Sequence, residues 1–569
     1  MLARSLAARK LKASATSAPL ISRCPDALQA PCAWSGSSNA IHGKDVKIPS
    51  QPQQPQHRRN YRSYVRVRAP GGTGSARVPL GSSVYGQSIS RGTRPYQEDA
   101  FSVSCLEIPP KELRASLKRG GRISTEAEKR WKWNSQDDEL DTELAGQVNW
   151  FGVFDGHGGD YASKYLSKYL HQIFESVQPD MVTDTVQFTR EHGGYFRRFT
   201  GGELARWTRQ EELKPVRGGR AGKQPGSNKT PNAEHMEQVS TSQSSGPTAN
   251  ASTSGGSSGP PISAAAASKR STVVPQWDDA GLTQRILPPE DVKDQSLTMS
   301  ERATLAFLVA DRHILMRHPQ PNEKDASQGG MTDRRGIQTR ESIAKREQQE
   351  KGPEAKGQVQ EGMGGSTASV LTLHSIDSPP TIWYDSKFLQ LGAWHLGDTR
   401  MLLCPTADGK CIPLTTHHHP DTLSESERLR RLGAGVVTDS FGEARWMGAL
   451  ANTRALGDGE FKAAGVTSEP ELLSQVIRSD NYSHVTLFSD GISSVMSDQE
   501  VVDLARGCKH PQEAAKKILD FAEELGVADN ATVLVVPLKG WGKIGGQDST
   551  LKQREYRKSK TDVFRDNRQ

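Results

Sequence analysis

The sequence predicts a mixed α+β domain, because two kinds of local pattern alternate along it. Short apolar runs rich in β-branched residues and bounded by Gly, Asp or Asn predict strands, as at Val148–Phe154 and His484–Phe488. Longer segments with apolar residues at helical spacing or with capping signals predict helices. These helices are expected from Asp160 to Val177, from Ser497 to Gly507 and from Pro511 to Gly526.

Acidic residues stand at the ends of the predicted strands. Asp155 follows Val148–Phe154, and Asp490 follows His484–Ser489 in the same way. An Asp-Gly pair after a strand is usually only a turn, so each acid alone is also explained as a turn residue. Three further segments share the arrangement: Glu98 and Asp99 before Ala100–Leu106, Asp398 near a bend between two short strands, and Asp529 before Ala531–Pro537.

The repeated placement predicts a cation site. Carboxylates that share one cleft raise one another's pKa sharply, so their charge has to be offset. Hard divalent cations do this with oxygen ligands and retained waters, and they need no Cys or His among their ligands. Independent turn capping explains any one segment as well as a metal does, but it explains the whole set poorly. We therefore expect these acids to converge on divalent cations.

The residues also resemble a known family. In chain order, the segments that carry the resemblance are Arg94–Asp99, Asp155–Gly159, Gly365–Ala368, Gly397–Arg400, Leu414–Pro420, Arg454–Asp458, Ser468–Pro470, Asp490–Gly491 and Asp529–Asn530. Together they resemble the metal-dependent serine/threonine protein phosphatases of type 2C (the PPM family), including its fungal mitochondrial members. Each motif alone is weak, whereas the ordered set is specific.

The resemblance implies a role for each matching metal ligand. Asp155 would bridge two ions, either Mg²⁺ or Mn²⁺. Asp490 and Asp529 would complete the first ion's ligands, and Glu98 with the Gly156 carbonyl would complete the second's.

Four further residues match positions with other roles. Asp99 would hydrogen-bond metal-bound waters, and Arg94 would hold the substrate phosphate with its planar, permanently charged fork. His157 would be the general acid that protonates the departing serine or threonine oxygen. Asp398, together with Asp490, matches the position of a weaker third ion.

The chemistry expected of such a site is metal-assisted phosphoester hydrolysis. Two cations roughly 3.5–4 Å apart share a water, lower its pKa and direct it at phosphorus. No covalent enzyme intermediate is needed. In agreement, none of the 6 cysteines lies in a His-Cys-five-residues-Arg loop, and their scattered positions suggest a reducing compartment.

Two departures from the family pattern bear on these expectations. Ser494 stands where the family usually has Asp, which questions the third ion, and His417 replaces the Asp of a Leu-Thr-x-Asp-His-x-Pro motif. Three consecutive side chains cannot all face one ion, so we interpret His417–His419 as a polar loop before a helix at Thr422–Leu432 and not as a zinc site. The departures keep open a catalytically silent scaffold or regulatory binding module. A small-molecule phosphatase is a further alternative.

The resemblance also implies the architecture: a central antiparallel β-sandwich flanked by helices on both sides, within a phosphatase domain at residues 81–540. A hydrophobic content of 34% with 53 Gly and 32 Pro indicates that much of the chain is not packed. We expect disordered, low-complexity insertions at about 218–272 and 317–362, and a shorter extra stretch at Pro109–Gly146. Residues 541–569 are expected to be a disordered basic tail.

Charge is distributed unevenly along the chain, and its distribution suggests a subcellular location. Residues 1–97 hold fifteen Lys or Arg and two acids, a net charge of +13, so the whole-chain value of +7 leaves −6 for residues 98–569. The basic excess therefore belongs to the N-terminus and not to a nucleic-acid-binding face. Met1–Lys12 is basic, Ala-rich and acid-free, as mitochondrial presequences are, although a plain disordered tail is the alternative.

These observations set the remaining expectations. Residues 1–80 are predicted to be a mitochondrial presequence with a disordered segment, and the protein is predicted to act in the matrix. No apolar run reaches the roughly 18–20 residues needed to cross a bilayer, so no transmembrane segment is expected. We expect a monomer that acts on phosphoproteins and binds no nucleic acid.

Overall fold

The structure is a computed structural model, and it describes residues 63–69, 74–119, 143–193, 199–215, 296–317, 364–430, 436–438, 444–446, 448 and 450–566. All of them belong to one compact unit, Asn60–Gln569. Most of the presequence and disordered segment expected at residues 1–80 lies outside the described residues, because residues 1–62 and 70–73 are not among them. The same holds for the insertions expected at 218–272 and 317–362 (Arg317 apart) and for most of the extra stretch before Gly146.

Two antiparallel sheets dominate the described residues, as predicted. The first has the strand order β15-β9-β8-β5-β4 and the second β11-β10-β16-β17-β3. Strands of the first are β4 (Ala100–Glu107), β5 (Gln147–Phe154), β8 (Ala368–Ser375), β9 (Phe388–Leu396) and β15 (Glu471–Arg478). Strands of the second are β3 (Gly86–Ser90), β10 (Arg400–Pro405), β11 (Ile412–Pro413), β16 (Tyr482–Phe488) and β17 (Ala531–Pro537).

Smaller strands lie around these sheets. A three-stranded ladder has the order β14-β7-β6, and two hairpins pair β1 with β2 and β12 with β13. Their bounds are β1 (Tyr64–Arg68), β2 (Ser75–Pro79), β6 (Gly156–His157), β7 (Gly365–Ser366), β12 (Val436–Thr438), β13 (Ala444–Trp446) and β14 (Leu456–Gly457).

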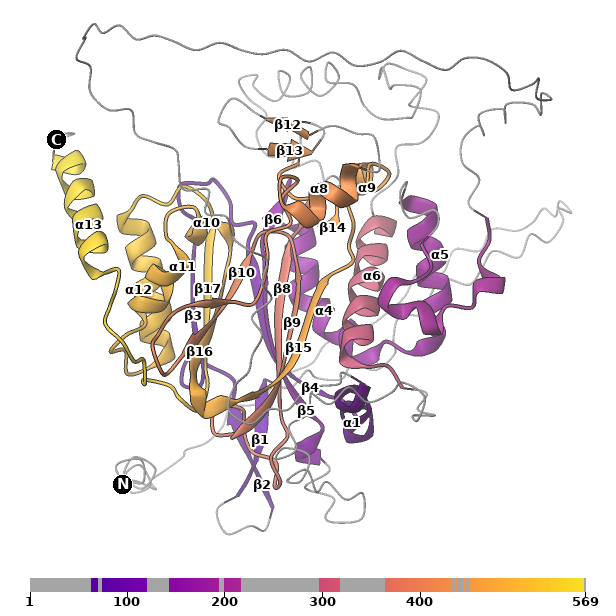
Figure 1. The fold of residues 1–569 in the computed structure, drawn as a ribbon, viewed down its shortest axis with the longest axis horizontal. Coiled ribbons are helices and arrows are strands. Elements are labelled where there is room, and N and C mark those ends of the chain that lie inside the picture. The colour runs from indigo at the N-terminus through magenta and orange to yellow at the C-terminus, as the bar shows by residue number, and fades with distance from the viewer. Residues whose placement is uncertain are drawn as a thin grey trace, which may run out of the picture. The chain divides into compact units, whose positions relative to one another are not determined.

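Helices cover both outer faces of the sandwich, which confirms the predicted fold class. In Figure 1, α4 and α6 lie outside the first sheet, and α11 and α12 lie outside the second. The α-helices are α1 (Pro110–Arg119), α4 (Tyr161–Ser176), α5 (Val182–His192), α6 (Met299–Arg317), α8 (Leu423–Arg430), α9 (Gly459–Lys462), α10 (Asp490–Ser493), α11 (Asp498–Leu504), α12 (Pro511–Glu524) and α13 (Leu551–Asp566). Short 3₁₀ helices occur at Pro179–Met181, Gly202–Trp207, Gln210–Glu212 and Ser479–Asn481.

Three apolar layers hold the four layers of secondary structure together. Along β5, side chains alternate, so Phe151 packs between the sheets while Trp150 packs against α4. On the other side, Phe488 of β16 joins the layer under α11 and α12, whereas Leu487 joins the layer between the sheets. Because both faces of each sheet are covered, β5 and β16 are buried along their whole length.

The expected helices form with nearly the expected ends. α11 begins at a capping box in which Ser497 accepts from the backbone N–H of Glu500 and the Glu500 carboxylate accepts from the Ser497 N–H. α12 begins with Pro511, and Gly526 after its end has a φ of 81°, a left-handed conformation that favours glycine. The helix predicted at Thr422–Leu432 is α8.

Two domain boundaries predicted from the sequence are wrong. Strands β1 and β2 pair over their full length before residue 80, so the folded part begins earlier than residue 81. At the other end, the expected disordered tail contains α13. Ion pairs join this helix to the rest of the domain: Arg557 pairs with the buried carboxylate of Glu500 at 3.0 Å and Lys558 with Glu524 at 2.8 Å.

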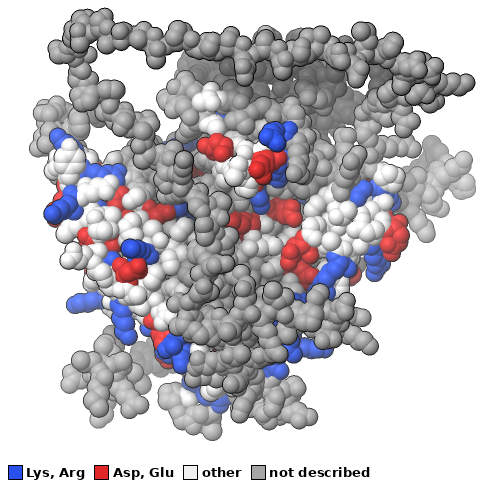
Figure 2. Space-filling model, viewed as in Figure 1, with Lys and Arg blue, Asp and Glu red and all other residues white. Residues whose placement is uncertain are grey.

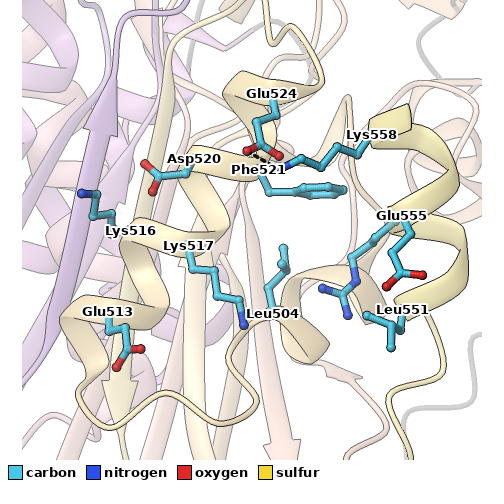
Figure 3. A pocket seen from close by; sticks show the side chains of 11 residues that line it. Leu504, Glu513, Lys516, Lys517, Asp520, Phe521, Glu524, Leu551, Glu555 and Lys558 are labelled. Carbon is cyan, nitrogen blue, oxygen red and sulfur yellow. Dashed lines mark hydrogen bonds and ion pairs between the residues drawn. The ribbon is translucent and has the colours of Figure 1, made fainter. Parts of the chain in front are cut away.

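A groove of about 500 Å³ lies between α12 and α13 (Figure 3). Its apolar lining is Leu504, Phe521 and Leu551, and charged side chains of both signs surround it. The lining residues belong to α11, α12 and α13, so this groove is separate from the strand ends that carry the predicted site.

Surface charge is mixed on the face shown in Figure 2, where the described residues alternate in sign. Among the described residues of this face, no large field of one sign is seen, whereas such a field is typical of a surface that binds polyanions. Within the described residues, no helix combines the length and the apolar character that a membrane crossing requires.

Candidate metal centre

The register of the strands brings the predicted acids to one end of the sandwich. Ala100 pairs with Phe154 in the first sheet, so Asp99 and Asp155 lie next to each other at the ends of neighbouring strands. In the second sheet, Arg400 pairs with Phe488, and Phe488 pairs with Val533 on its other side. Asp398, Asp490 and Asp529 therefore also lie together at one end of these strands. Antiparallel pairing thus explains why acids before some strands meet acids after others.

Three of these carboxylates form a close cluster. One oxygen from each of Asp155, Asp398 and Asp490 lies within 4.8 Å of the other two. The three come from the end of β5, the β9–β10 connection and the start of α10. Such a spacing between like charges is unfavourable unless a cation or protons offset it.

The pKa values of the cluster report this repulsion. Desolvation and the neighbouring charge of Asp490 hold the pKa of Asp155 well above its ordinary value. Desolvation and the charge of Asp398 raise the pKa of Asp490 to about 7. Asp398 differs, because the adjacent His419 outweighs desolvation and lowers its pKa.

Asp99 lies buried beside the cluster. Its Oδ2 accepts hydrogen bonds from Ser489 Oγ and Thr532 Oγ1, each at 2.7 Å, while its Oδ1 has no hydrogen-bond partner. Desolvation raises the pKa of Asp99 to about 6 despite the two hydroxyl donors. An unpartnered buried carboxylate oxygen fits a site that holds metal-bound water.

Glu98 and Gly156 lie together on another side. The backbone N–H of Gly159 donates to Glu98 Oε1 at 2.7 Å, and the Glu98 N–H donates to Asn530 Oδ1 at 2.7 Å. A Cβ at Gly156 would lie 2.5 Å from the Glu98 carbonyl oxygen, so only glycine allows this approach. The glycine of the Asp-Gly-His motif therefore brings the second-ion residues close to each other.

Arg94 is placed at the rim of the same site. Its Nη2 lies 2.7 Å from Asp529 Oδ2, and its side chain is 52% exposed. A guanidinium that is held by one predicted ligand yet reaches solvent is suited to contact an incoming anion.

The donor set fits divalent cations of the Mg²⁺ or Mn²⁺ type. All the clustered side-chain donors are carboxylate oxygens, which hard cations prefer. Two of the acids, Asp99 and Asp398, carry a buried oxygen without a hydrogen-bond partner. These two oxygens would bind cations without first breaking hydrogen bonds within the protein.

Comparisons with known proteins agree with this geometry. A family model described as Protein phosphatase 2C matches residues 318–531. Protein phosphatase 2C homolog 4 of Schizosaccharomyces pombe is 46% identical over 160 residues, which cover 28% of this chain and 41% of that protein. Protein phosphatase 1K, mitochondrial, of Xenopus laevis is 36% identical over 155 residues, which cover 27% of this chain and 41% of that protein. Residues 318–531 of the chain are therefore similar to the protein phosphatase 2C family.

These matches cover part of each molecule. The chain spans less than half the length of either relative. The segment that matches the type 2C family model contains Asp398, Asp490 and Asp529, whereas Glu98 and Asp155 precede it. Among solved structures, the chain is similar to a serine-threonine phosphatase 2C from Toxoplasma gondii. The match covers 83% of this chain and 98% of that chain, with 16% sequence identity and a TM-score of 0.37. A score this low supports no further conclusion.

His157 has a partner that sequence reasoning did not assign. The Nε2 of His157 lies 2.8 Å from Asp458 Oδ2 and 3.0 Å from Oδ1. Desolvation acts to lower the pKa of His157, but the Asp458 charge and hydrogen bond outweigh it and raise the pKa to about 9. Asp458 stood in a recognised motif, Arg454–Asp458, which gave no hint of this contact.

Asp458 is itself held in an unusual conformation by residues that the sequence analysis missed. Its φ of 49° is left-handed, which is uncommon for a residue other than glycine. Asp311 on α6 accepts from the neighbouring Gly457 N–H at 2.8 Å and pairs with Lys462 at 3.0 Å. The start of α6 did have a signal, since Thr298 and Glu301 form a capping box of side-chain and backbone hydrogen bonds.

The three consecutive histidines contact three different groups. His417 pairs with Arg400, His418 accepts at Nδ1 from the Gly397 N–H at 3.0 Å, and His419 Nε2 lies 3.3 Å from Asp398 Oδ2. As expected from their spacing, their rings do not converge on one point.

His418 nevertheless lies near two other residues that bind metals in many proteins. One ligand atom each of His395, His418 and Glu471 lies within 4.8 Å of the others. The hydrogen bonds argue against a metal there. Because His418 Nδ1 accepts a backbone N–H, its Nε2 carries the proton, and His395 Nε2 is within 2.9 Å of the Thr416 carbonyl, to which it donates. Both facing nitrogens are therefore donors, and Glu471 is the acceptor beside them.

Proposed function

We propose that this protein is a metal-dependent serine/threonine protein phosphatase that hydrolyses phosphoserine and phosphothreonine in proteins. The observation that carries the proposal is the cluster of Asp155, Asp398 and Asp490 at one end of the sandwich, with oxygens within 4.8 Å of one another and raised pKa values for two of the three. Similarity to the protein phosphatase 2C family supports it.

In this proposal two ions share Asp155. Asp490 and Asp529 complete one set of ligands, and Glu98 with the Gly156 carbonyl completes the other. The bound ions would supply an activated water and neutralise charge on the phosphoryl oxygens, with no covalent enzyme intermediate. Asp99, with its unpartnered Oδ1, would orient water molecules at the site.

The remaining roles belong to groups at the rim. Arg94 would receive the substrate phosphate, since its exposed guanidinium already reaches the site through Asp529. His157 would donate a proton to the departing oxygen, and Asp458 would keep it protonated and aimed. Asp458 is thus a positioning residue, because it acts through His157.

We further propose that the protein is imported into mitochondria and acts as a monomer on matrix phosphoproteins. The acid-free basic N-terminus supports import, as does similarity to a relative whose name includes "mitochondrial". A fluorescent fusion to residues 1–80 tests the address. Diffuse cytosolic signal would overturn this part of the proposal without affecting the chemistry.

The activity is tested with the purified full chain and a phosphothreonine peptide. We expect hydrolysis with Mn²⁺ and none after chelation, and much slower hydrolysis of a sugar phosphate. Hydrolysis that continues unchanged after chelation would contradict the proposed role of the metal ions. Metal-dependent cleavage of the sugar phosphate alone would indicate a small-molecule phosphatase, and no hydrolysis of either would favour the silent binding module.

A further inference from the structure

The third corner of the acid cluster differs from what the family pattern provides. Ser494 stands at the place of a usual Asp, and its hydroxyl donates to the Gly491 carbonyl at 2.8 Å, back into its own helix turn. Ser494 therefore does not replace the missing carboxylate. A third cation at Asp398 would lose one of its usual oxygen donors.

His419 lies where another donor is needed. Its Nε2 is 3.3 Å from Asp398 Oδ2, and its side chain is 38% exposed. The loop that carries it is fixed on both sides, because the His418 N–H donates to the Gly397 carbonyl at 2.9 Å and the Thr422 N–H donates to the His419 carbonyl at 3.0 Å. Of the three consecutive histidines, His419 lies within hydrogen-bonding distance of an acid of the cluster, whereas His417 pairs with Arg400 and His418 accepts from the Gly397 N–H.

Asp398 supplies an independent sign that a ligand belongs here. Its side chain is only 10% exposed, and its Oδ1 has no hydrogen-bond partner. Its carboxylate also reaches within 4.8 Å of Asp155 and Asp490, so it points into the cluster. A buried carboxylate oxygen without a partner is costly unless an ion or water completes it.

We propose that His419 is a nitrogen ligand of a third cation, which it binds together with Asp398 and Asp490. The inference rests on the proposed function, because it places this cation beside the two ions of the phosphatase site. Imidazole suits Mn²⁺ and later transition metals better than Mg²⁺, which strongly prefers oxygen. The third position in this chain is therefore selective for transition metals, while the two carboxylate-rich positions accept either ion.

The simpler alternative is that His419 only pairs with Asp398. In that case the imidazole nitrogen never contacts a metal, and its removal leaves metal binding unchanged or improves it. The two cases are separated by measuring nitrogen contact with the metal directly, which does not depend on catalysis.

The test uses Mn²⁺ as the probe on the full chain. Equilibrium dialysis counts bound ions, and pulsed electron paramagnetic resonance detects ¹⁴N coupling to Mn²⁺. We expect the wild-type chain to bind about one more Mn²⁺ ion than His419→Gln, and we expect the variant to lose the ¹⁴N coupling. His417→Gln, which changes the neighbouring ring that pairs with Arg400, is the matched control and should keep both.

Two further readouts keep the result decisive. If His419→Gln does not fold, His419→Asp should bind as many ions as the wild type, without the ¹⁴N coupling and with at least about tenfold less preference for Mn²⁺ over Mg²⁺ at the third position. Equal stoichiometry and equal ¹⁴N signals in wild type and His419→Gln would overturn the inference while leaving a two-ion phosphatase intact. A wild-type chain that binds no Mn²⁺ at all would instead overturn the proposed function.

Discussion

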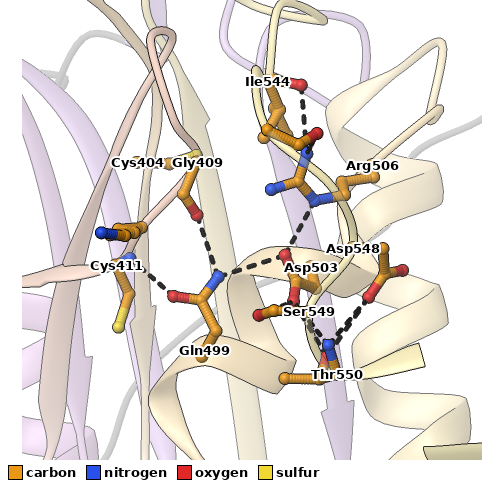
Figure 4. A network of polar contacts seen from close by, with 12 residues as sticks. Cys404, Gly409, Cys411, Gln499, Asp503, Arg506, Ile544, Asp548, Ser549 and Thr550 are labelled. Atoms are coloured by element: carbon orange, nitrogen blue, oxygen red, sulfur yellow. Dashed lines mark hydrogen bonds and ion pairs between the residues drawn. The ribbon is translucent and has the colours of Figure 1, made fainter. Parts of the chain in front are cut away.

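Two groups of acidic side chains in this molecule differ in what offsets their charge. Asp503 on α11 is buried, and it accepts hydrogen bonds from Arg506 Nε at 2.7 Å and from Thr550 Oγ1 at 2.9 Å (Figure 4). Despite desolvation, these donors lower its pKa. Asp490, only a few residues earlier in the chain, has a pKa raised to about 7 by desolvation and by other acids, with Asp398 foremost among them.

The difference shows which buried acids receive arginine or hydroxyl partners from the protein and which do not. Glu425 repeats the pattern of Asp503, because Arg454 and Arg428 outweigh its desolvation and lower its pKa to about 2. Structural acids therefore come with arginine and hydroxyl donors from the same chain. Asp155 and Asp490 instead face other acids, which raise their pKa values, and this is the arrangement expected of a site that binds cations from solution.

The largest effect is expected from Asp155→Ala. Loss of the carboxylate that is proposed to bridge both ions should lower phosphopeptide hydrolysis by about 10³-fold or more, since metal ions contribute several kcal/mol to such reactions. Initial rates at saturating Mn²⁺ provide the measurement. Asp184→Ala, which removes an exposed acid on α5, is the control and should leave the rate unchanged. If the Asp155 variant kept a tenth of the activity, the shared-ligand role would be wrong.

Substitution of Asp503, the acid that pairs with Arg506, should lower stability and leave activity unchanged. Asp503→Ala leaves the Arg506 guanidinium without its carboxylate and should reduce the free energy of unfolding by about 3 kcal/mol, while activity per folded molecule stays unchanged. Urea unfolding measures this. Lys558→Ala breaks the exposed pair with Glu524, so it should cost less than about 1 kcal/mol. Equal effects of the two variants would show that the Asp503 contacts do not stabilise the fold.

A smaller effect is expected from Asp458→Asn, and it depends on pH. With Asp458 present, the pKa of His157 is raised to about 9, so the proton donor is lost only as the pH rises through that value. Without the carboxylate the pKa falls, and the donor is lost at lower pH. The ratio of wild-type to variant kcat should therefore grow about tenfold between neutral pH and pH 9. A ratio that is constant with pH would exclude His157 as the proton donor.

The smallest effect concerns stability and pH. Asp490 and Asp99 have folded-state pKa values raised to about 7 and about 6, so their favourable contribution is present at acidic pH and is lost as the pH rises through these values. Mn²⁺ should offset this loss. The difference in Tm between Mn²⁺ and chelator should widen by about 3 °C from pH 5 to pH 8. A difference that narrows with pH would mean that the acids repel one another less than the structure implies.

Much of the site could be predicted because strand periodicity and end placement are local. Asp155 and Asp490 follow short apolar runs whose β-branched content favours strands, and the packing of the two sheets brings the ends of these strands together. The capping box at Ser497 and the Pro511 start of α12 were equally local signals.

The contacts that could not be predicted join residues far apart in sequence through polar groups. His157 meets Asp458 from 301 positions away, and no periodicity encodes that pairing. The sequence of helix α13 shows no clear apolar periodicity that would have predicted it. In the structure the helix is held by contacts such as that of Arg557 with Glu500. Asp311 lies on α6, a helix that is apolar nearly all round and follows a long low-complexity segment, and only its Thr298–Glu301 capping box could have revealed it.

The central claim is that the clustered acids at the strand ends bind divalent cations. The most direct test is calorimetric titration of Mn²⁺ into the chelator-treated full chain, compared with Asp155→Asn, which keeps the side-chain shape and removes its charge. The account predicts that the wild type binds at least two ions and that the variant loses tight binding of both, because they share Asp155. Binding by Asp155→Asn with unchanged stoichiometry and affinity would contradict it.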